Sequence, residues 1–67
     1  MRFKAGDTVR VTDKLRSACI PPDAQGKVIL DFGANTWVDF GDTKSLTGDH
    51  PLGGGWLMFE DEIEHAA

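Results

Sequence analysis

Residues 6–12 (Gly-Asp-Thr-Val-Arg-Val-Thr) constrain the fold more than any other stretch, because polar and apolar side chains alternate strictly after a two-residue turn signal. Successive side chains of a strand point to opposite faces of its sheet, so Val9 and Val11 would face a core and the residues between them solvent. Glycine and aspartate favour the tight turn that precedes such a strand. The stretch therefore predicts a β-strand with one buried face.

The second predicted strand, residues 27–32, is rich in β-branched and other large apolar residues, and a Gly-Ala-Asn turn signal follows it. The chain then returns through a third predicted strand at residues 36–40, in which Trp37 and Asp39 would face outward. This pair of segments predicts a hairpin. If the alternation is regular, the inward residues are Val28, Leu30 and Phe32 in the second strand and Val38 and Phe40 in the third.

Two long connections separate the predicted strands. Residues 13–25 contain two adjacent prolines, which lack amide donors and restrict their neighbours, so the segment is neither a helix nor a central strand. Leu15 and Ile20 would anchor this loop over the core. Residues 43–55 carry four glycines and a proline, which predicts a second loop. Both loops should be the most mobile segments, because they form few ladder hydrogen bonds.

Residues 56–59 predict a short apolar strand, and residues 60–62 suit a single turn of helix before Ile63 returns to the core. Phe3 would cover one end of that core. The predicted fold is all-β: a single domain over residues 1–67, built as a small SH3-like five-stranded antiparallel barrel with a short helical turn near the C-terminus. Its predicted core is Val9, Val11, Val28, Leu30, Val38, Phe40, Leu57 and Ile63.

The formal net charge of −4 is distributed unevenly along the chain. Residues 1–27 hold six bases and three acids, whereas residues 28–67 hold one base and eight acids. One interpretation is a two-faced surface whose basic half meets phosphate or an acidic partner. The other is that the first and last strands lie side by side, so that opposite charges offset each other across one sheet. The sequence leaves both open.

Sixty-seven residues are enough for one small domain, which buries only roughly 60% of the surface that its unfolded chain exposes. Cys19 is the single cysteine, so no internal disulfide can form. Residues 1–4 lack the apolar run of a signal peptide, and no stretch approaches the ~20 apolar residues that cross a bilayer. We therefore expect a cytoplasmic location and no membrane partner, with the oligomeric state left open.

The residues that could suggest catalysis or metal binding are Cys19, His50 and His65. They match no C-x-x-C or H-x-x-x-H spacing, and a closed zinc site needs about four ligands. The glycine run 53–55 has no following Lys-Ser/Thr, so it does not match a phosphate-binding loop. We expect no enzyme activity, no catalytic residue, no metal and no cofactor.

The order of these segments also resembles known families. Residues 3–11 (Phe-Lys-Ala-Gly-Asp-Thr-Val-Arg-Val), 26–28, 38–40 and 60–64 are similar to the SH3-like barrels of electron-transport accessory proteins. That group includes the variable chain of ferredoxin-thioredoxin reductase, a small photosystem I subunit and the barrel of the nitrile hydratase β chain. The Gly-Asp-x-Val-x-Val opening also resembles KOW-type barrels. The resemblance implies a barrel fold and a non-catalytic, partner-binding role, with no specific partner.

Trp37 is the main candidate for a binding contact, because an exposed tryptophan supplies a large contact area with few rotamers to freeze. Trp56 is instead expected to close the bottom of the small core. In SH3-like barrels the long first loop and the strands of the central hairpin can present one continuous face, so parts of residues 13–25 are expected to join Trp37 in the contact surface. The predicted partner-binding set is Trp37, Arg10, Lys14, Arg16 and Asp39.

The function expected from these features is that of a small protein-interaction module, an accessory or regulatory subunit that docks on a larger protein. An inhibitor or nucleic-acid mimic is a special case of this role, suggested by the acidic second half. The alternative is a KOW-like nucleic-acid-binding barrel that uses the basic first half while Trp37 stacks on bases. A sequence pI of about 4.8 disfavours this alternative, since clustered positive charge drives phosphate binding.

Overall fold

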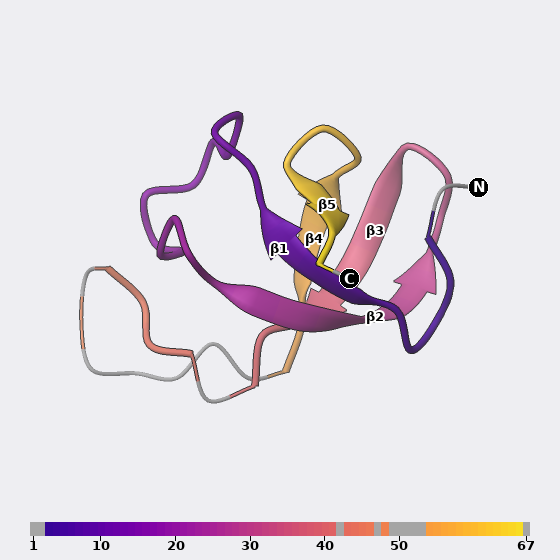
Figure 1. Ribbon diagram of the computed structural model, residues 1–67, viewed down its shortest axis with the longest axis horizontal. Helices are drawn as coiled ribbons and strands as arrows, with labels where there is room; N and C mark the ends of the chain where they lie inside the picture. Colours follow the sequence, from indigo (N-terminus) through magenta and orange to yellow (C-terminus); the bar gives the residue numbers. More distant parts are fainter. Residues whose placement is uncertain (1–2, 42, 47, 49–53, 67) are drawn as a thin grey trace.

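The computed structural model describes residues 3–41, 43–46, 48 and 54–66. Its five strands are β1 (Thr8–Val11), β2 (Gln25–Asp31), β3 (Asn35–Asp39), β4 (Trp56–Phe59) and β5 (Ile63–His65). They form one antiparallel sheet in the order β4-β3-β2-β1-β5, so the first and last strands are neighbours (Figure 1). The predicted all-β class and the five antiparallel strands are confirmed.

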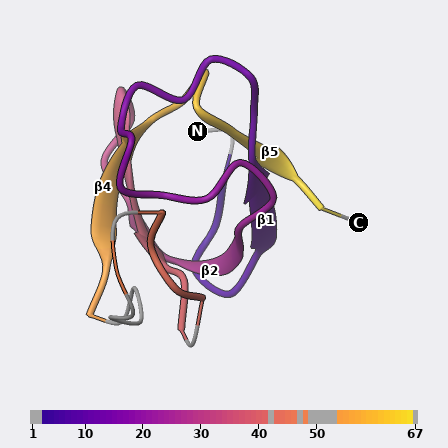
Figure 2. The same ribbon diagram turned by 90° about the vertical axis from the view of Figure 1, so that its left-hand side faces the viewer.

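The sheet is curled, with β4 on one side and β1 and β5 on the other, while the connection between β1 and β2 crosses over the top (Figure 2). Within the described residues, however, no ladder joins β4 to β5. The side chain of Glu62 takes the place of such a ladder, because its Oε1 accepts the Phe59 amide at 2.8 Å. The predicted closed barrel is therefore wrong in this respect, since the sheet is open along the β4 edge.

The connection from β4 to β5 is a turn and a bend, where the sequence predicts a turn of helix. One backbone hydrogen bond closes it, from the Glu62 amide to the Phe59 carbonyl at 3.0 Å. Four residues suffice for this turn, because the Glu62 carboxylate also accepts the Phe59 amide. Side-chain hydrogen bonding thus replaces the predicted helical turn.

A β-bulge in β2 changes which side chains face the core. Val28 pairs with Val38 and Leu30 pairs with Trp37, so Ile29 is an additional residue on the β2 side. A bulge shifts the alternation by one position and bends the strand. As a result Leu30 is 50% exposed, and Asp31 turns inward in its place. The prediction that Leu30 and Phe32 share the inner face with Val28 is wrong.

The inward carboxylate of Asp31 is satisfied by backbone donors. Its Oδ2 accepts the Phe3 amide at 3.0 Å, and its Oδ1 accepts the Gly33 amide at 2.6 Å. A buried carboxylate needs such partners, because each missing hydrogen bond costs on the order of 1–3 kcal/mol of desolvation. Asp31 thereby links the segment before β1 to the β2–β3 turn.

The core lies inside the curl of the sheet. Met58 is buried and Leu57 is 53% exposed, the reverse of the predicted assignment in β4. All four residues of β4 are apolar, so the strand has no alternation that could reveal its inner face. Leu15 and Trp56 pack against the core as partly buried side chains. The buried apolar residues are Phe3, Val9, Val11, Ile20, Ala24, Val28, Val38, Phe40, Met58 and Ile63.

Six of the eight predicted core residues are thus confirmed, together with Phe3 at the end of the core and Ile20 as an anchor of the first loop.

The two long loops touch, because the Leu46 amide donates to the Cys19 carbonyl at 3.1 Å. Residues 47 and 49–53 of the second loop lie outside the described residues, and His50 is among them. The mobility of both loops stays a prediction.

Candidate functional site

The outer face of β2, β3 and β4 carries large apolar side chains in two cross-strand rows. Trp37 on β3 is paired with Leu57 on β4 and with Leu30 on β2. One row further on, Asn35 is paired with Phe59, and its carbonyl accepts the Phe32 amide at 2.8 Å. We call this surface the outer patch and define it as Leu30, Phe32, Asn35, Trp37, Leu57 and Phe59.

Four apolar side chains of the outer patch are about half exposed: Leu30 by 50%, Phe32 by 62%, Leu57 by 53% and Phe59 by 49%. The whole chain has 4210 Å² of accessible surface. A compact monomer of this mass is expected to have about 4,200 Å². The patch is therefore exposed on a chain that is already compact, and contiguous apolar surfaces of this kind mark contact sites.

Within the outer patch, Phe32, Asn35, Trp37 and Leu57 line an open hollow of about 320 Å³. The Trp37 indole forms its wall by lying directly on the backbone of Gly55, which has a φ of 99°. A Cβ at position 55 would contact Trp37 Nε1 and would lie 2.7 Å from Cε2. This contact explains why Trp37 is half-buried, although the sequence predicts it to be exposed. Gly55 therefore sets the position of the indole.

We predict that Gly55→Ala displaces the Trp37 ring, whereas Gly54→Ala does not. Both glycines have positive φ, so each alanine should cost roughly 1–2 kcal/mol of backbone strain. Only Gly55 adds a steric clash with the indole, because a Cβ at Gly54 meets nothing within 4 Å. In a Trp56→Phe background, Trp37 fluorescence should shift to longer wavelength in Gly55→Ala alone. Equal spectra for the two variants would contradict this account of the hollow.

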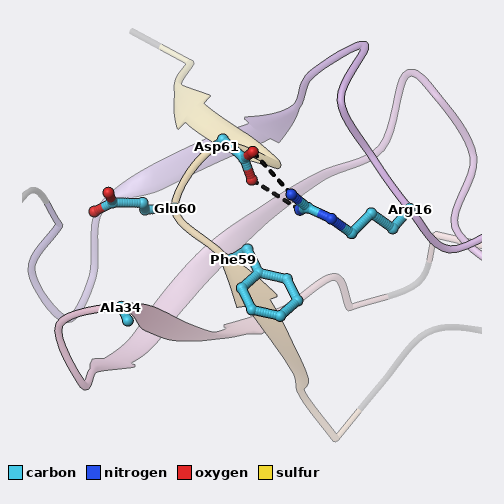
Figure 3. A pocket seen from close by; sticks show the side chains of 5 residues that line it. All are labelled: Arg16, Ala34, Phe59, Glu60 and Asp61. Atoms are coloured by element: carbon cyan, nitrogen blue, oxygen red, sulfur yellow. Dashed lines mark hydrogen bonds and ion pairs between the residues drawn. The ribbon is translucent and has the colours of Figure 1, made fainter.

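A second hollow, of about 290 Å³, adjoins the outer patch at Phe59 (Figure 3). The Arg16 guanidinium lies 4.7 Å from the centre of the Phe59 ring. Its two terminal nitrogens donate to the Asp61 carboxylate at 2.8 and 3.0 Å, while the Glu60 side chain points away from Arg16. Arg16 therefore extends the apolar surface with a cation fixed by stacking and a bidentate ion pair.

Electrostatics keep this ion pair charged. The hydrogen bonds from Arg16 lower the pKa of Asp61, and the same bonds raise the pKa of Arg16. Both groups are exposed to solvent, so the pair adds little stability. What it provides is a defined polar end to the apolar surface.

The structure separates the predicted partner-binding residues into two groups. Trp37 and Asp39 lie on the outer side of β3, and Arg16 adjoins the outer patch through Phe59. Arg10 lies on β1, two strands from β3, and Lys14 is exposed in the loop that follows β1. No contact given by the structure joins Arg10 or Lys14 to the patch within the described residues. The role of these five residues in binding a partner stays a prediction.

Ion pairs between the two halves of the chain support the interpretation that their charges offset each other. Arg10 on β1 contacts Glu64 on β5 at 2.6 Å, and Arg16 contacts Asp61 at 2.8 Å. Asp7 lies 3.2 Å from His65 Nε2 on β5. The Asp7 carboxylate also accepts the Lys4 amide at 2.9 Å, and this hydrogen bond is the main cause of the lowered pKa of Asp7. Two of the bases in the first half are therefore neutralised locally.

The described residues contain no group of three or more His, Cys, Asp or Glu side chains that could hold a metal ion. Cys19 is a free, half-buried thiol, and His65 packs its ring at 4.8 Å from Phe3. In the part of the chain that the structure describes, no helix has the length and apolar composition needed to cross a membrane.

Sequence reasoning identified Trp37 but missed the four apolar residues around it, which are Leu30, Phe32, Leu57 and Phe59. Two of them follow the bulge, and the other two lie on the all-apolar β4, so alternation could not show that they face outward. Their pairing with β3 is the signal that places them. No protein-family model matches the chain, and no curated protein or solved structure matches it significantly. The resemblance to SH3-like accessory proteins therefore stays a prediction.

Proposed function

We propose that this chain is a small non-catalytic protein-interaction module, an accessory or regulatory subunit that docks on a larger protein through the outer patch. The observation that carries the proposal is the continuous apolar surface over three strands, with four large side chains about half exposed. Protein interfaces combine an apolar, aromatic centre with a polar rim. Here Lys27 and Asp39, paired across β2 and β3, border one end, and Arg16 with Asp61 borders the other.

The proposal includes a variant of the SH3-like barrel as the fold. Its support is the curled sheet in which β5 adds to β1, the long first loop, and the hairpin of β2 and β3. A cytoplasmic location is also part of the proposal, because a free cysteine such as Cys19 persists in a reducing compartment.

We predict that Trp37→Ala weakens binding to the larger partner at least about 30-fold, the effect of truncating a central interface tryptophan. The partner is first identified by mass spectrometry of proteins retained from the source cell by the immobilised chain. Its affinity for purified variants is then measured by calorimetry. Leu46→Ala is the matched control, since Leu46 is 59% exposed but lies outside the outer patch. Equal affinities of both variants for the partner would refute docking through this surface.

One observation favours the alternative, a nucleic-acid-binding barrel. Phe32, Trp37 and Phe59 form an aromatic surface on which bases could stack, and Lys27 and Arg16 lie at its two ends. Titration with single- and double-stranded oligonucleotides separates the two functions. Binding that falls steeply between about 50 and 200 mM salt supports this alternative and would replace the protein-partner proposal.

A further inference from the structure

The outer patch has an internal symmetry about β3. The first row reads Leu30, Trp37, Leu57 across the three strands, and the second reads Phe32, Asn35, Phe59. Each row therefore has the same residue type on both sides of the central strand. A surface of this kind matches itself when it is turned by 180° about an axis parallel to β3.

We propose that the outer patch binds a second copy of this chain, forming a symmetric dimer whose two-fold axis runs along β3. In this arrangement Leu30 of one copy faces Leu57 of the other, and Phe32 faces Phe59. Trp37 meets Trp37 near the axis. An interface around a two-fold axis uses the same surface on both subunits and must be complementary to itself, which the Leu-Trp-Leu and Phe-Asn-Phe rows satisfy.

Asn35 provides the polar contact that fits the axis. A side-chain amide carries both donors and an acceptor, so two asparagines related by a two-fold axis can exchange a pair of hydrogen bonds. A polar residue at the centre of an apolar interface fixes the register of the two copies. Asn35 lies in the middle of its row, between Phe32 and Phe59.

The charges at the ends of the patch are compatible with this dimer. The Asp39 carboxylate accepts the Gly41 amide at 2.8 Å, so it is turned toward the end of β3, and it is paired across the strands with Lys27. At the other end Asp61 is neutralised by Arg16. The apolar centre is thus bordered at one end by a lysine and an aspartate on neighbouring strands and at the other by the Arg16–Asp61 ion pair, and not by charge of one sign alone.

The small area of the patch favours a weak dimer. Aromatic side chains bury 150–250 Å² each when fully covered, so half-exposed ones give a total of roughly 400–500 Å² per copy with the leucines included. Both copies then bury on the order of 900 Å², which is below the usual size of stable interfaces. Since the monomer is already compact, we expect folded monomers in equilibrium with a weak dimer whose population depends on concentration.

The dimer goes beyond the docking function, because it needs no other protein. A second copy and a larger partner would compete for the same surface, so dissociation of the dimer would precede docking. Failure of either proposal leaves the other testable, because self-association is measured on the purified chain alone.

Sedimentation equilibrium of the purified chain, from about 1 µM to 1 mM, tests the dimer. The average mass should rise with concentration from one chain toward two. Leu57→Glu and Leu30→Lys should each remain monomeric. In a dimer of either variant, both Leu30–Leu57 contacts would place a charged side chain against a leucine of the other copy. The mixture of the two variants should associate again, since one contact becomes a lysine facing a glutamate and the other is unchanged.

Leu46→Glu is the control, because it adds the same charge at an exposed leucine outside the patch, and it should dimerise like the original chain. Amide spectra of each variant check that it folds. If a leucine variant does not fold, Asn35→Asp replaces it, since it changes only the charge at the axis and should abolish dimers at neutral pH. A monomer throughout, or no association in the mixture, would overturn the proposed dimer.

Discussion

Gly26→Ala is expected to destabilise the fold by about 3 kcal/mol, the upper end of the usual cost of overpacking and a large part of the stability of a domain this small. Gly26 lies on β2 where the strand pairs with Val9 of β1 and its backbone comes close to the end of β3. A Cβ there would lie 2.6 Å from the Asp39 carbonyl oxygen and 2.9 Å from side-chain carbons of Val38 and Phe40. The nearest neighbour is backbone, so relief requires movement of a strand.

Urea unfolding followed by circular dichroism measures this change, and Gln25→Ala is the matched control on the adjacent residue. Gln25 is exposed, so its substitution should change the free energy of unfolding by no more than about 0.5 kcal/mol. If Gly26→Ala is too unstable to titrate, its amide spectrum should show an unfolded chain. A well-folded Gly26→Ala variant within 1 kcal/mol of the original, a difference of about fivefold in the folding equilibrium, would mean that β2 and β3 can separate at little cost.

The close approach at Gly26 also shows what a sequence can and cannot reveal. Alternation in residues 8–11 and 36–40 predicted the inner faces of β1 and β3, because these strands keep a regular period of two. Gly26 carries no comparable local signal: the need for a missing side chain comes from a strand that lies more than ten residues away in the sequence.

The two incorrect core residues have different physical causes. Leu30 moved outward because one additional residue in β2 shifted the period, and a bulge depends on pairing with β3 more than on local sequence. Leu57 was misplaced because β4 lacks polar residues that would mark its solvent face. Both errors concealed the same surface, so the outer patch could be found only from the register of three strands. Of its residues, Trp37 alone was predicted.

The connection between β4 and β5 was also only partly predictable. The acidic segment 60–62 predicts a helical turn, yet Glu62 is 4% exposed and acts as an acceptor for two separate backbone segments. Buried glutamate is rare unless it is paired, so composition alone favours a solvent-exposed acid. The partners of Glu62 come from the loop after β1 and from β4, which only the folded chain brings together.

Glu62→Ala is accordingly expected to lower the free energy of unfolding by roughly 2–4 kcal/mol. Its Oε2 accepts the Arg16 amide at 2.8 Å and its Oε1 accepts the Phe59 amide at 2.8 Å, while Arg16 Nη1 lies 3.8 Å away. Removing the carboxylate leaves two partly buried amides without an acceptor and frees the first loop from the open edge of β4. Burial, and not the ion pair, is the cause of this large effect.

Glu64→Ala provides the matched control, because Glu64 also pairs with an arginine but its side chain is 44% exposed. Exposed ion pairs contribute about 0–1 kcal/mol, so this variant should remain close to the original chain in urea unfolding. Glu62→Gln should fall between the two, since the amide keeps one oxygen acceptor for one of the two backbone donors. Equal losses in Glu62→Ala and Glu64→Ala would show that Glu62 acts only as a surface charge. In that case the hydrogen bonds of the Glu62 carboxylate to the Arg16 and Phe59 amides would contribute little, and another contact would have to hold the first loop against β4.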